Sequence, residues 1–269
     1  MDGSISRSLT LKLPKAAICT VCSDRFVPGL TVMLQSLNDN MRAFADLPVR
    51  VFFNTRKAPL SRENQDRINR RFANVTFHDS DWHNGFDGEL ESDLHRPAFL
   101  AIEAFRQDDL ERVIYLDSDT LCTGELGELL FLDCDFAAVP CRKPKAGRFN
   151  SGLMVIGQRL LSHSVADAIS ALDGRIGEYW ADQPRINAYL QANTDLRLMA
   201  LPEIYNFMYI AGHPETGDDA QFQRLESHIR LIHWAGREAK RPKPWNINTP
   251  LSKADSLWWH VYESTGVTA

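Results

Sequence analysis

Apolar residues follow two different patterns along this chain. Short, nearly continuous apolar runs alternate with longer segments in which apolar residues recur every three or four positions. The short runs predict buried strands, and the longer segments predict amphipathic helices. This alternation is typical of repeated strand–helix units, so the sequence predicts a single Rossmann-like α/β domain with a mixed, mainly parallel central sheet. The predicted strands span residues 16–22, 49–53, 75–77, 112–116, 136–139, 153–156 and 229–233.

The first predicted helix follows the first strand after a turn at residues 23–26. It opens at Pro28, because proline is favoured in the first turn of a helix, and its apolar positions recur as far as Phe44. A second, basic-faced helix is predicted from Ser61 to Phe72, with the serine as its N-cap. Further helices are predicted near residues 97–107, 164–172 and 182–192.

Local composition indicates the loops and the ends of the domain. Residues 79–93 and 212–220 are rich in Asp and Gly, which predicts loops. With no internal repeat and no linker, residues 16–245 are expected to form one domain after an N-terminal extension of residues 1–15. Residues 246–269 are expected to form a helical, aromatic-rich tail packed on that domain. Contact of this tail with a membrane face is the alternative.

The overall composition is that of a globular protein, since 44% of the 269 residues are hydrophobic and 24% are charged. A chain of this size buries roughly three quarters of its unfolded surface, so it needs no metal or disulfide in order to fold. The formal charge of −5 excludes an overall basic field for nucleic acid. No segment has the apolar core of a secretory signal or the roughly 18 apolar residues that span a bilayer. We therefore expect a cytoplasmic protein with no transmembrane segment, either free or at the inner face of a membrane.

The five cysteines are expected to be reduced, because their number is odd and each lies in an apolar, strand-like context. Cys19 and Cys22 form a C-x-x-C pair, but positions three apart on a strand point to opposite faces. A zinc or redox site at this pair is the alternative, and no second ligand pair with suitable spacing supports it.

The run V-I-Y-L-D-S-D-T-L, residues 113–121, places Asp117 and Asp119 at the carboxyl end of a buried strand. Open α/β sheets bind their ligands at this edge. Two neighbouring carboxylates repel each other, and a hard divalent cation such as Mg²⁺ or Mn²⁺ relieves that repulsion. A solvated Asp-Ser-Asp turn is one alternative. A haloacid dehalogenase-type phosphatase is another, but Leu121 occupies the Thr/Val position of its D-x-D-x-T/V motif.

Two later segments place short polar side chains beside a predicted strand and a predicted helix. In R-F-N-S-G-L-M-V-I, Asn150 and Ser151 precede a buried strand, and Gly152 permits the close approach of another backbone segment or of a ligand. In W-A-D-Q-P-R-I-N, Asp182 is placed as a helix N-cap. Each segment also has a purely structural explanation, as a turn and as a cap.

The segment L-I-H-W-A-G-R-E-A-K-R-P-K-P-W, residues 231–245, combines an imidazole at a strand end with a glycine and several cations. His233 can complete a metal site through a neutral nitrogen. Gly236 permits the close approach of a phosphate, which the neighbouring cations can neutralise. A structural histidine and a solvated basic loop are the alternatives. The cations are Arg237, Lys240, Arg241 and Lys243.

Taken in order, L-D-S-D, F-N-S-G, D-Q-x3-N and H-x-x-G with K-P-W resemble glycosyltransferase family 8, which includes glycogenin-like and bacterial lipopolysaccharide galactosyl- and glucosyltransferase-like enzymes. The resemblance covers residues 16–245 and includes an opening loop, T-V-C-S-D-R-F-V-P-G, like the family's nucleotide-binding loop. It implies a GT-A catalytic domain. It also implies a retaining hexosyltransferase of polysaccharide biosynthesis that uses Mn²⁺ or Mg²⁺, a UDP-sugar donor and a saccharide or lipid-linked glycan acceptor.

By matching position, the resemblance also implies roles for particular residues. The metal ion would be held by Asp117, Asp119 and His233. The catalytic group around the donor sugar would be Asn150, Asp182 and Gln183. Phe26 would stack on the uracil, since stacking needs only an aromatic face. The nucleotide donor would be bound by Thr20, Cys22, Ser23, Phe26, Arg96, Asp117, Ser118, Ser151, Gly236, Lys240 and Lys243.

Two departures from the family pattern leave alternatives open. Family members have a lysine three positions after the glycine of H-x-x-G, whereas the lysine of K-P-W here is Lys243, seven positions after Gly236. Either Lys240 or Lys243 could therefore bind the diphosphate. The basic residue expected before the D-x-D strand is either Arg96 or Arg106. The irregular lysine spacing also admits a catalytically silent module that only binds nucleotide sugars.

Overall fold

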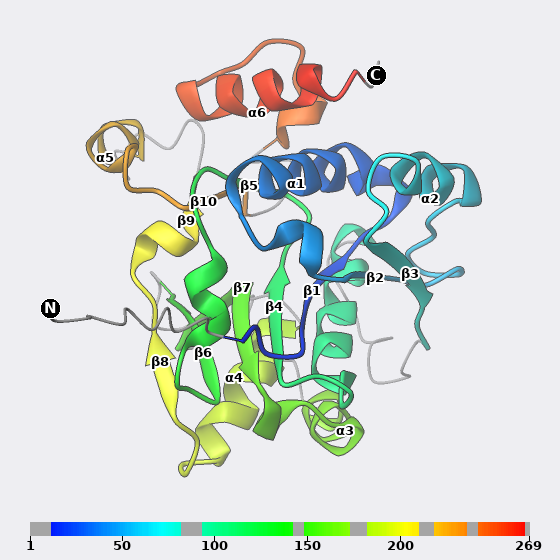
Figure 1. The fold of residues 1–269 in the computed structure, drawn as a ribbon, viewed down its shortest axis with the longest axis vertical. Helices are drawn as coiled ribbons and strands as arrows, with labels where there is room; N and C mark the ends of the chain where they lie inside the picture. The colour runs from blue at the N-terminus through cyan, green and yellow to red at the C-terminus, as the bar shows by residue number, and fades with distance from the viewer. Residues whose placement is uncertain are drawn as a thin grey trace, which may run out of the picture.

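A seven-stranded sheet forms the centre of the protein, which the computed structural model describes over residues 12–81, 93–141, 148–172, 182–209, 218–235 and 242–266 (Figure 1). Its strands are β1 (Ala16–Val21), β2 (Val49–Phe53), β3 (Val75–Asp79), β4 (Arg112–Leu116), β6 (Phe136–Pro140), β7 (Phe149–Gly157) and β8 (Leu198–Ala200). They stand in the order β3-β2-β1-β4-β7-β6-β8. β7 runs antiparallel to both neighbours, whereas β1–β2, β1–β4, β2–β3 and β6–β8 pair in parallel. The predicted mixed, mainly parallel sheet is confirmed.

Helical layers cover both faces of this sheet. One face carries α1 (Val27–Asn40) and α2 (Arg62–Asn69), and the other carries a 3₁₀ helix (Asp93–Arg106), α3 (His163–Ala171) and α4 (Asp182–Ala192). Successive side chains of a strand point to opposite faces, so each strand contributes to two cores. In β1, Ile18 packs with Leu30 of α1, whereas Cys19 packs in the cluster that contains Ile169 of α3.

The cysteines occupy the positions that the strand pattern predicts. Cys19 and Cys22 belong to different core clusters, on opposite faces of the sheet. All five thiols are free, and four of them are buried. The C-x-x-C pair therefore brings no two thiols together, and the reduced state of the chain stays a prediction.

A second, three-stranded sheet connects the D-x-D segment with the C-terminal region. It is made of β5 (Thr120–Cys122), β9 (Phe207–Met208) and β10 (Leu231–His233), and α5 (Asp218–Leu225) precedes β10. β10 lies in the centre, antiparallel to β5 and parallel to β9. Leu121 and Ile232 of this sheet share a third core cluster with Val32 of α1. The small sheet is therefore anchored to the main domain by its own apolar contacts.

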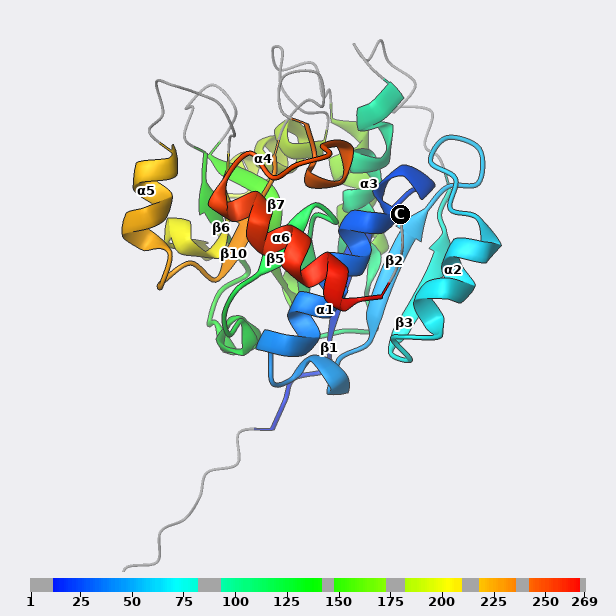
Figure 2. The ribbon, with the colours of Figure 1, turned by 90° about the horizontal axis from the view of Figure 1, so that it is seen from above.

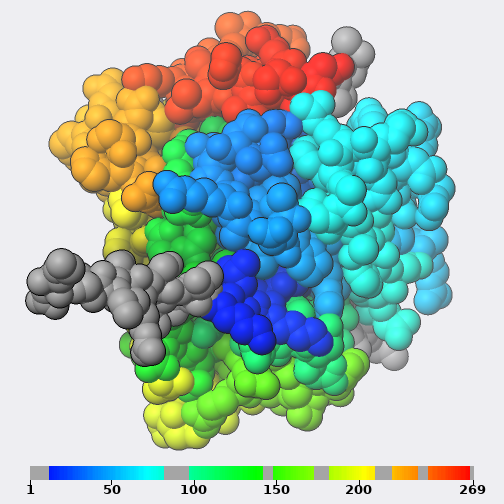
Figure 3. Space-filling view, in the orientation of Figure 1, coloured from blue at the N-terminus to red at the C-terminus, as the bar shows by residue number. Residues whose placement is uncertain are grey.

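The C-terminal helix α6 (Lys253–Ser264) lies across α1, as both ribbon views show (Figures 1 and 2). In the space-filling view the C-terminal segment rests directly on the surface of α1 (Figure 3). Trp258 is fully buried and stacks on Tyr262 with ring centroids 5.1 Å apart. The indole of Trp234, next to β10, donates to Asp255 of α6 at 2.9 Å. Among the described residues, no helix has the length and apolar character needed to cross a bilayer.

We expect Trp258→Ala to lower the free energy of unfolding by about 3–5 kcal/mol, because it empties a large, fully buried site between α6 and α1. Denaturant unfolding followed by circular dichroism measures this loss. His260→Ala, an exposed position on the same helix, is the matched control and should change little. Equal, small effects of the two substitutions would show that α6 is not docked in solution.

Some helices differ from the sequence prediction at their ends or in their geometry. α1 ends at Asn40, because Met41 adopts an extended conformation with φ −109° and ψ 109°. Phe44 lies instead in a separate 3₁₀ turn, although both apolar side chains remain buried. The helix predicted near residues 97–107 is a 3₁₀ helix that contains Pro97.

Other boundaries differ where the sequence pattern is short. Ser61 caps α2 as predicted and accepts from the N–H of Asn64 at 3.4 Å, but the helix ends three residues before Phe72. β3 continues to Asp79, into the predicted loop at 79–93, and α5 begins within the last part of the predicted loop at 212–220. Residues 82–92 and 210–217 lie outside the described residues. β5, β8 and β9 are not predicted, because two or three residues are too few to show a periodic pattern.

Strand direction decides which residues meet at the carboxyl edge of the main sheet. β1 and β4 end at this edge, but the antiparallel β7 begins there. The N–H of Asp117, just after β4, consequently donates to the carbonyl of Gly152 at 2.9 Å. The antiparallel pairing of β10 with β5 then places His233 opposite Thr120. The ends of β1, β4 and β10 and the start of β7 thus meet at the D-x-D pair, although they are distant in sequence.

Candidate active site

Two carboxylates and one imidazole converge at the end of β4. Nε2 of His233 lies 3.5 Å from Oδ2 of Asp117 and 3.2 Å from Oδ1 of Asp119. Taking one ligand atom from each residue, all three atoms lie within 4.8 Å of one another. His233 and Asp119 are buried, whereas the Asp117 side chain retains 30% exposure. This donor set of two carboxylate oxygens and an imidazole nitrogen fits a divalent transition-metal ion.

The two carboxylates experience different electrostatic environments. Burial, reinforced by the charges of Asp119 and Asp182, raises the pKa of Asp117 to about 7. Burial also acts to raise the pKa of Asp119, but that pKa is held well below its usual range, chiefly by the ammonium of Lys243. A cation placed among the three ligands would favour the ionised form of both carboxylates.

Gly152 explains how the histidine reaches this position. A Cβ atom at Gly152 would lie 2.3 Å from Cε1 and 2.4 Å from Nδ1 of His233, which is far inside van der Waals contact. The N–H of Trp234, the next residue in the chain, donates to the carbonyl of Asp119 at 3.2 Å. The sequence predicts that backbone or a ligand approaches Gly152, but the group that approaches it in the structure is the His233 imidazole.

Lys243 lies in direct contact with the D-x-D pair. Its buried ammonium donates to Oδ2 of Asp119 and, at 2.6 Å, to the carbonyl of Trp234. The same nitrogen lies 5.9 Å from the ring centroid of Phe26, whose ring packs edge-on against Trp245 at 5.6 Å. The structure therefore brings the predicted aromatic and one predicted lysine to the predicted metal site.

Because Gly29 has no side chain, the D-x-D segment and Trp245 can pack closely against α1. A Cβ atom there would lie 2.6 Å from the carbonyl of Ser118 and 2.8 Å from the ring of Trp245. The buried Ser118, between the two aspartates, is thus held against the first turn of α1 by its backbone. Trp245, the last residue of the K-P-W segment, packs against Gly29 as well.

The predicted sugar-binding residues form a second group, on β7 and α4. The carbonyl oxygen of the Gln183 side chain accepts from Nδ2 of Asn150 at 3.0 Å and from the N–H of Ser151 at 3.2 Å. Burial raises the pKa of Asp182, although a hydrogen bond from the Ser151 hydroxyl opposes the shift. The sequence predicts Asp182 as the N-cap of this helix, whereas in the structure Asp182 is the first residue of α4 itself. The Asn187 side chain bonds both backbone groups of Phe149 at 2.8 Å and so joins the two elements.

The remaining predicted nucleotide-binding residues lie at or after the end of β1. Thr20 is fully buried, and its hydroxyl has no hydrogen-bond partner in the described part of the chain. The thiol of Cys22 donates to the carbonyl of Ser23 at 3.3 Å. Thr20, Cys22 and Ser23 are all buried, whereas Phe26 is partly exposed. Phe26 is therefore the most accessible of the four residues predicted to bind the nucleotide in this region.

Three predicted residues cannot be placed, and one alternative is corrected. Gly236, Lys240 and the side chain of Arg96 lie outside what the structure describes. Arg106, the alternative to Arg96, points to the helical layer, where it bonds Glu103 at 3.1 Å and Asp167 of α3 at 2.6 Å. It is therefore committed to an ion-pair network away from the D-x-D pair.

Sequence reasoning missed two residues that contact the metal ligands. The Tyr115 hydroxyl donates to Oδ1 of Asp117 at 2.8 Å, and Oδ1 of Asn206 lies 2.9 Å from Nδ1 of His233. Alternation along β4 puts Tyr115 and Asp117 on the same side, so this contact had a signal in the sequence. Asn206 had none, because it precedes a two-residue strand.

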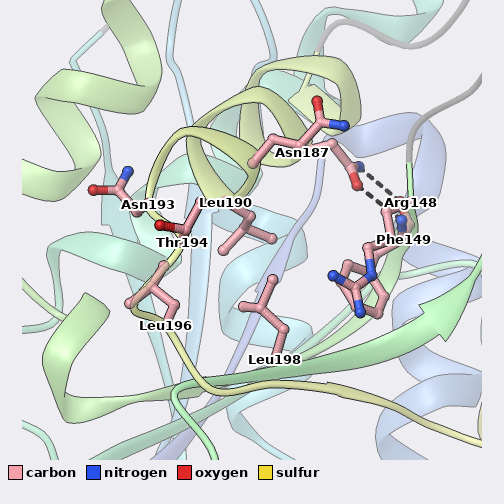
Figure 4. A pocket seen from close by; sticks show the side chains of 9 residues that line it. Arg148, Phe149, Asn187, Leu190, Asn193, Thr194, Leu196 and Leu198 are labelled. Carbon is pink, nitrogen blue, oxygen red and sulfur yellow. Dashed lines mark hydrogen bonds between the residues drawn. The ribbon is translucent and has the colours of Figure 1, made fainter.

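A pocket of about 330 Å³ lies between α4, the start of β7 and β8, and it shares no lining residue with the cluster of Asp117, Asp119 and His233 (Figure 4). Leu190, Leu196 and Leu198 form its apolar wall, and Arg148 and Thr194 contribute polar groups. None of the predicted site residues lines it. The candidate active site is accordingly the cluster at the carboxyl edge.

Comparison with known proteins adds an independent finding. A sequence model of glycosyl transferase family 8 matches residues 17–249. The glycosyltransferase GlyF of Streptococcus pneumoniae serotype 4 is 29% identical over 176 residues, which cover 60% of this chain and 39% of GlyF. Glycogenin of Neurospora crassa is 27% identical over 186 residues, which cover 64% of this chain and 24% of glycogenin. The chain therefore spans less than half the length of either relative.

Solved structures show the same fold at lower sequence identity. The galactosyltransferase LgtC, solved with donor and acceptor sugar analogues, matches with a TM-score of 0.68 at 17% identity, over 94% of this chain and 97% of LgtC. The bifunctional glycosyltransferase WbbM matches with a TM-score of 0.64 at 15% identity, over 94% of this chain and 50% of WbbM. These likenesses identify the GT-A fold.

Proposed function

Since the chain belongs to glycosyl transferase family 8, we propose that it transfers a hexose from a UDP-sugar to a saccharide or glycoconjugate acceptor, with the aid of a divalent cation and with retention of anomeric configuration. The observation that carries this proposal is the convergence of Asp117, Asp119 and His233 at the carboxyl edge of the sheet. Family membership speaks against the phosphatase interpretation of the D-x-D pair.

The proposed metal site uses residues that are already held in place. Asp117 and Asp119 supply anionic oxygens, and His233 supplies a neutral nitrogen. A bound Mn²⁺ or Mg²⁺ would stabilise the negative charge that develops on the diphosphate leaving group. Lys243 neutralises Asp119 from its other oxygen, so the three ligands and the lysine carry one net negative charge when both carboxylates are ionised. With a divalent cation the site becomes positive and suits an anionic donor.

The proposed donor-sugar site is the group on β7 and α4. Asn150, Ser151 and Gln183 are linked by hydrogen bonds, and the Asp182 carboxylate lies beside Ser151. We assign to Asp182 the support of positive charge at the anomeric carbon, because it is the anionic group of this set. Gln183 and Asn150 would orient the sugar hydroxyls.

The proposed nucleotide site is the loop that follows β1. Phe26 offers an aromatic face for uracil, and Ser23 begins the turn in which Phe26 lies. Lys243 is the candidate diphosphate ligand in the described part of the chain, since it lies near both Phe26 and Asp119. Its two present hydrogen bonds leave one ammonium proton for a phosphate oxygen.

A thermal-shift screen of UDP-, GDP- and dTDP-sugars with and without Mn²⁺ tests the proposal. A ligand at 100 times its Kd stabilises the folded state by about 2.7 kcal/mol, and we expect this effect for UDP-sugars with Mn²⁺. Release of UDP with a saccharide acceptor measures turnover, and NMR of the product reports its anomeric configuration. No UDP-dependent shift under any condition would contradict the proposal. Binding without turnover over a broad acceptor panel would instead support a silent nucleotide-sugar-binding module.

A further inference from the structure

A chain of three amide side chains, two of them buried, links the proposed metal site to the proposed sugar site. Asn206 lies at its centre and has no exposed surface. Its Oδ1 atom lies 2.9 Å from Nδ1 of His233, and its Nδ2 donates to Oδ1 of Asn150 at 2.6 Å. Asn150 in turn donates to Gln183. A metal ligand and two proposed sugar ligands are thus joined through one asparagine.

Two backbone N–H groups fix the orientation of this chain. The N–H of Gly152 donates to Oδ1 of Asn150 at 3.0 Å, so the atom at that position must be an oxygen. The N–H of Ser151 identifies the Gln183 oxygen in the same way. Asn206 must therefore turn its NH₂ group toward Asn150 and its oxygen toward the imidazole. A flipped Asn206 would place its side-chain oxygen against the side-chain oxygen of Asn150, with no hydrogen between them.

The orientation of Asn206 determines the tautomer of His233. An amide oxygen only accepts hydrogen bonds, so Nδ1 of the imidazole must carry the hydrogen. Nε2 of the neutral ring is then left with its lone pair facing Asp117 and Asp119. That is the form in which an imidazole binds a metal ion.

We propose that Asn206 is a positioning residue, which holds His233 as the Nδ1–H tautomer with Nε2 free for the cation. This inference rests on the proposed function and adds a residue to it. The Asn206 side chain acts through its two partners, His233 and Asn150. The backbone holds it on both sides, because its N–H donates to Glu203 at 3.0 Å and Met208, two residues on, pairs with His233.

Calorimetric titration of the metal-free protein with Mn²⁺ tests this role without any turnover. A metal-binding histidine has a hydrogen-bond partner on its other ring nitrogen, and loss of that partner typically weakens metal binding 10- to 100-fold. We expect a loss of this size for Asn206→Ala. Asn206→Asp keeps an acceptor for Nδ1–H and should bind Mn²⁺ at least as tightly as wild type. It cannot donate to Asn150, so its kcat should fall while its metal affinity is retained.

Asn74→Ala is the matched control, because the Asn74 amide makes two hydrogen bonds at 2.9 Å, to Phe44 and Leu47. Asn74 precedes β3, the edge strand of the seven-stranded sheet, whereas His233 belongs to the three-stranded sheet. It should lose stability without losing Mn²⁺ affinity. Equal Mn²⁺ affinities of wild type and a folded Asn206→Ala protein would overturn the proposal. So would a weakening that Asn206→Asp does not restore.

Nitrogen NMR of histidine-labelled, metal-free protein provides a second readout that needs no variant of Asn206 to fold. The His233 signals are identified by their absence in His233→Gln. In the neutral ring we expect the hydrogen on Nδ1, and finding it on Nε2 would refute the inference outright. If the NMR result holds but wild type binds no Mn²⁺, the proposed function fails while the positioning of His233 by Asn206 stands.

Discussion

Asp119→Asn is expected to lower the rate of sugar transfer by about 10²- to 10³-fold, the cost of removing one group that stabilises charge in a transition state. An amide supplies no anionic oxygen to the cation between Asp117 and His233. It also leaves the ammonium of Lys243 without its carboxylate partner, in a site where only 4% of the lysine side chain is exposed. Breaking a buried ion pair costs about 3–5 kcal/mol, so we expect a loss of stability as well.

A double substitution separates these two effects. Adding Lys243→Met to Asp119→Asn removes the unpaired buried charge, so stability should largely return while activity should not. Initial rates of UDP release and denaturant unfolding measure the two quantities. Asp133→Asn is the control, since 88% of that side chain is exposed and it pairs with Arg197 at the surface. Normal rates in a folded Asp119→Asn protein would remove this carboxylate from the mechanism.

Gly152→Ala is expected to displace His233 from the metal site. The added methyl group would lie 2.3 Å from the imidazole, so either the ring or the start of β7 must move. A misplacement of about 1 Å in a catalytic arrangement costs roughly 100-fold in rate, and we expect a loss of that size. Mn²⁺ affinity should fall in parallel, because one of the three ligands has moved. Titration with Mn²⁺ and initial-rate measurements check both effects.

Gly157→Ala, at the other end of the same strand, is the matched control. A Cβ atom there would lie 2.7 Å from the carbonyl of Cys134 and 3.2 Å from Cα of Asp135, so this substitution also strains β7. It should lower stability but leave Mn²⁺ affinity unchanged, because it does not touch His233. If both glycine substitutions weakened Mn²⁺ binding equally, general distortion of the strand rather than contact with the histidine would be the cause.

Much of the local structure follows from short-range physics that the sequence records directly. The apolar run that ends before Asp117 predicts β4 and its carboxyl end, because a short strand buried on both faces is apolar at successive positions. Ser61 predicts the start of α2, because its hydroxyl can accept from an N–H that the helix leaves free. The separation of Cys19 from Cys22 follows from the two-residue period of a strand.

Helix ends follow less well, because they depend on contacts with other segments. The apolar spacing in α1 continues through Met41 to Phe44, yet the helix stops at Asn40. The Asn40 side chain donates to the carbonyls of Ser36 in its own helix and Cys122 in β5, so a distant strand takes part in that end. Both apolar side chains still reach the core, because burial does not require that the helix continue.

The sequence by itself determined most of the helices and strands, and it placed the D-x-D pair at the end of a strand. It also placed Gly152 two positions after Asn150. All of these features depend on residues that are neighbours in the chain. Only the tertiary structure decided that β7 runs against the other strands and so brings Gly152 to Asp117. It likewise decided that Lys243 pairs with Asp119 across 124 positions and that Asn206 meets His233. Strand order and direction are set by the packing of the whole core, so no local period in the sequence can encode contacts over such separations.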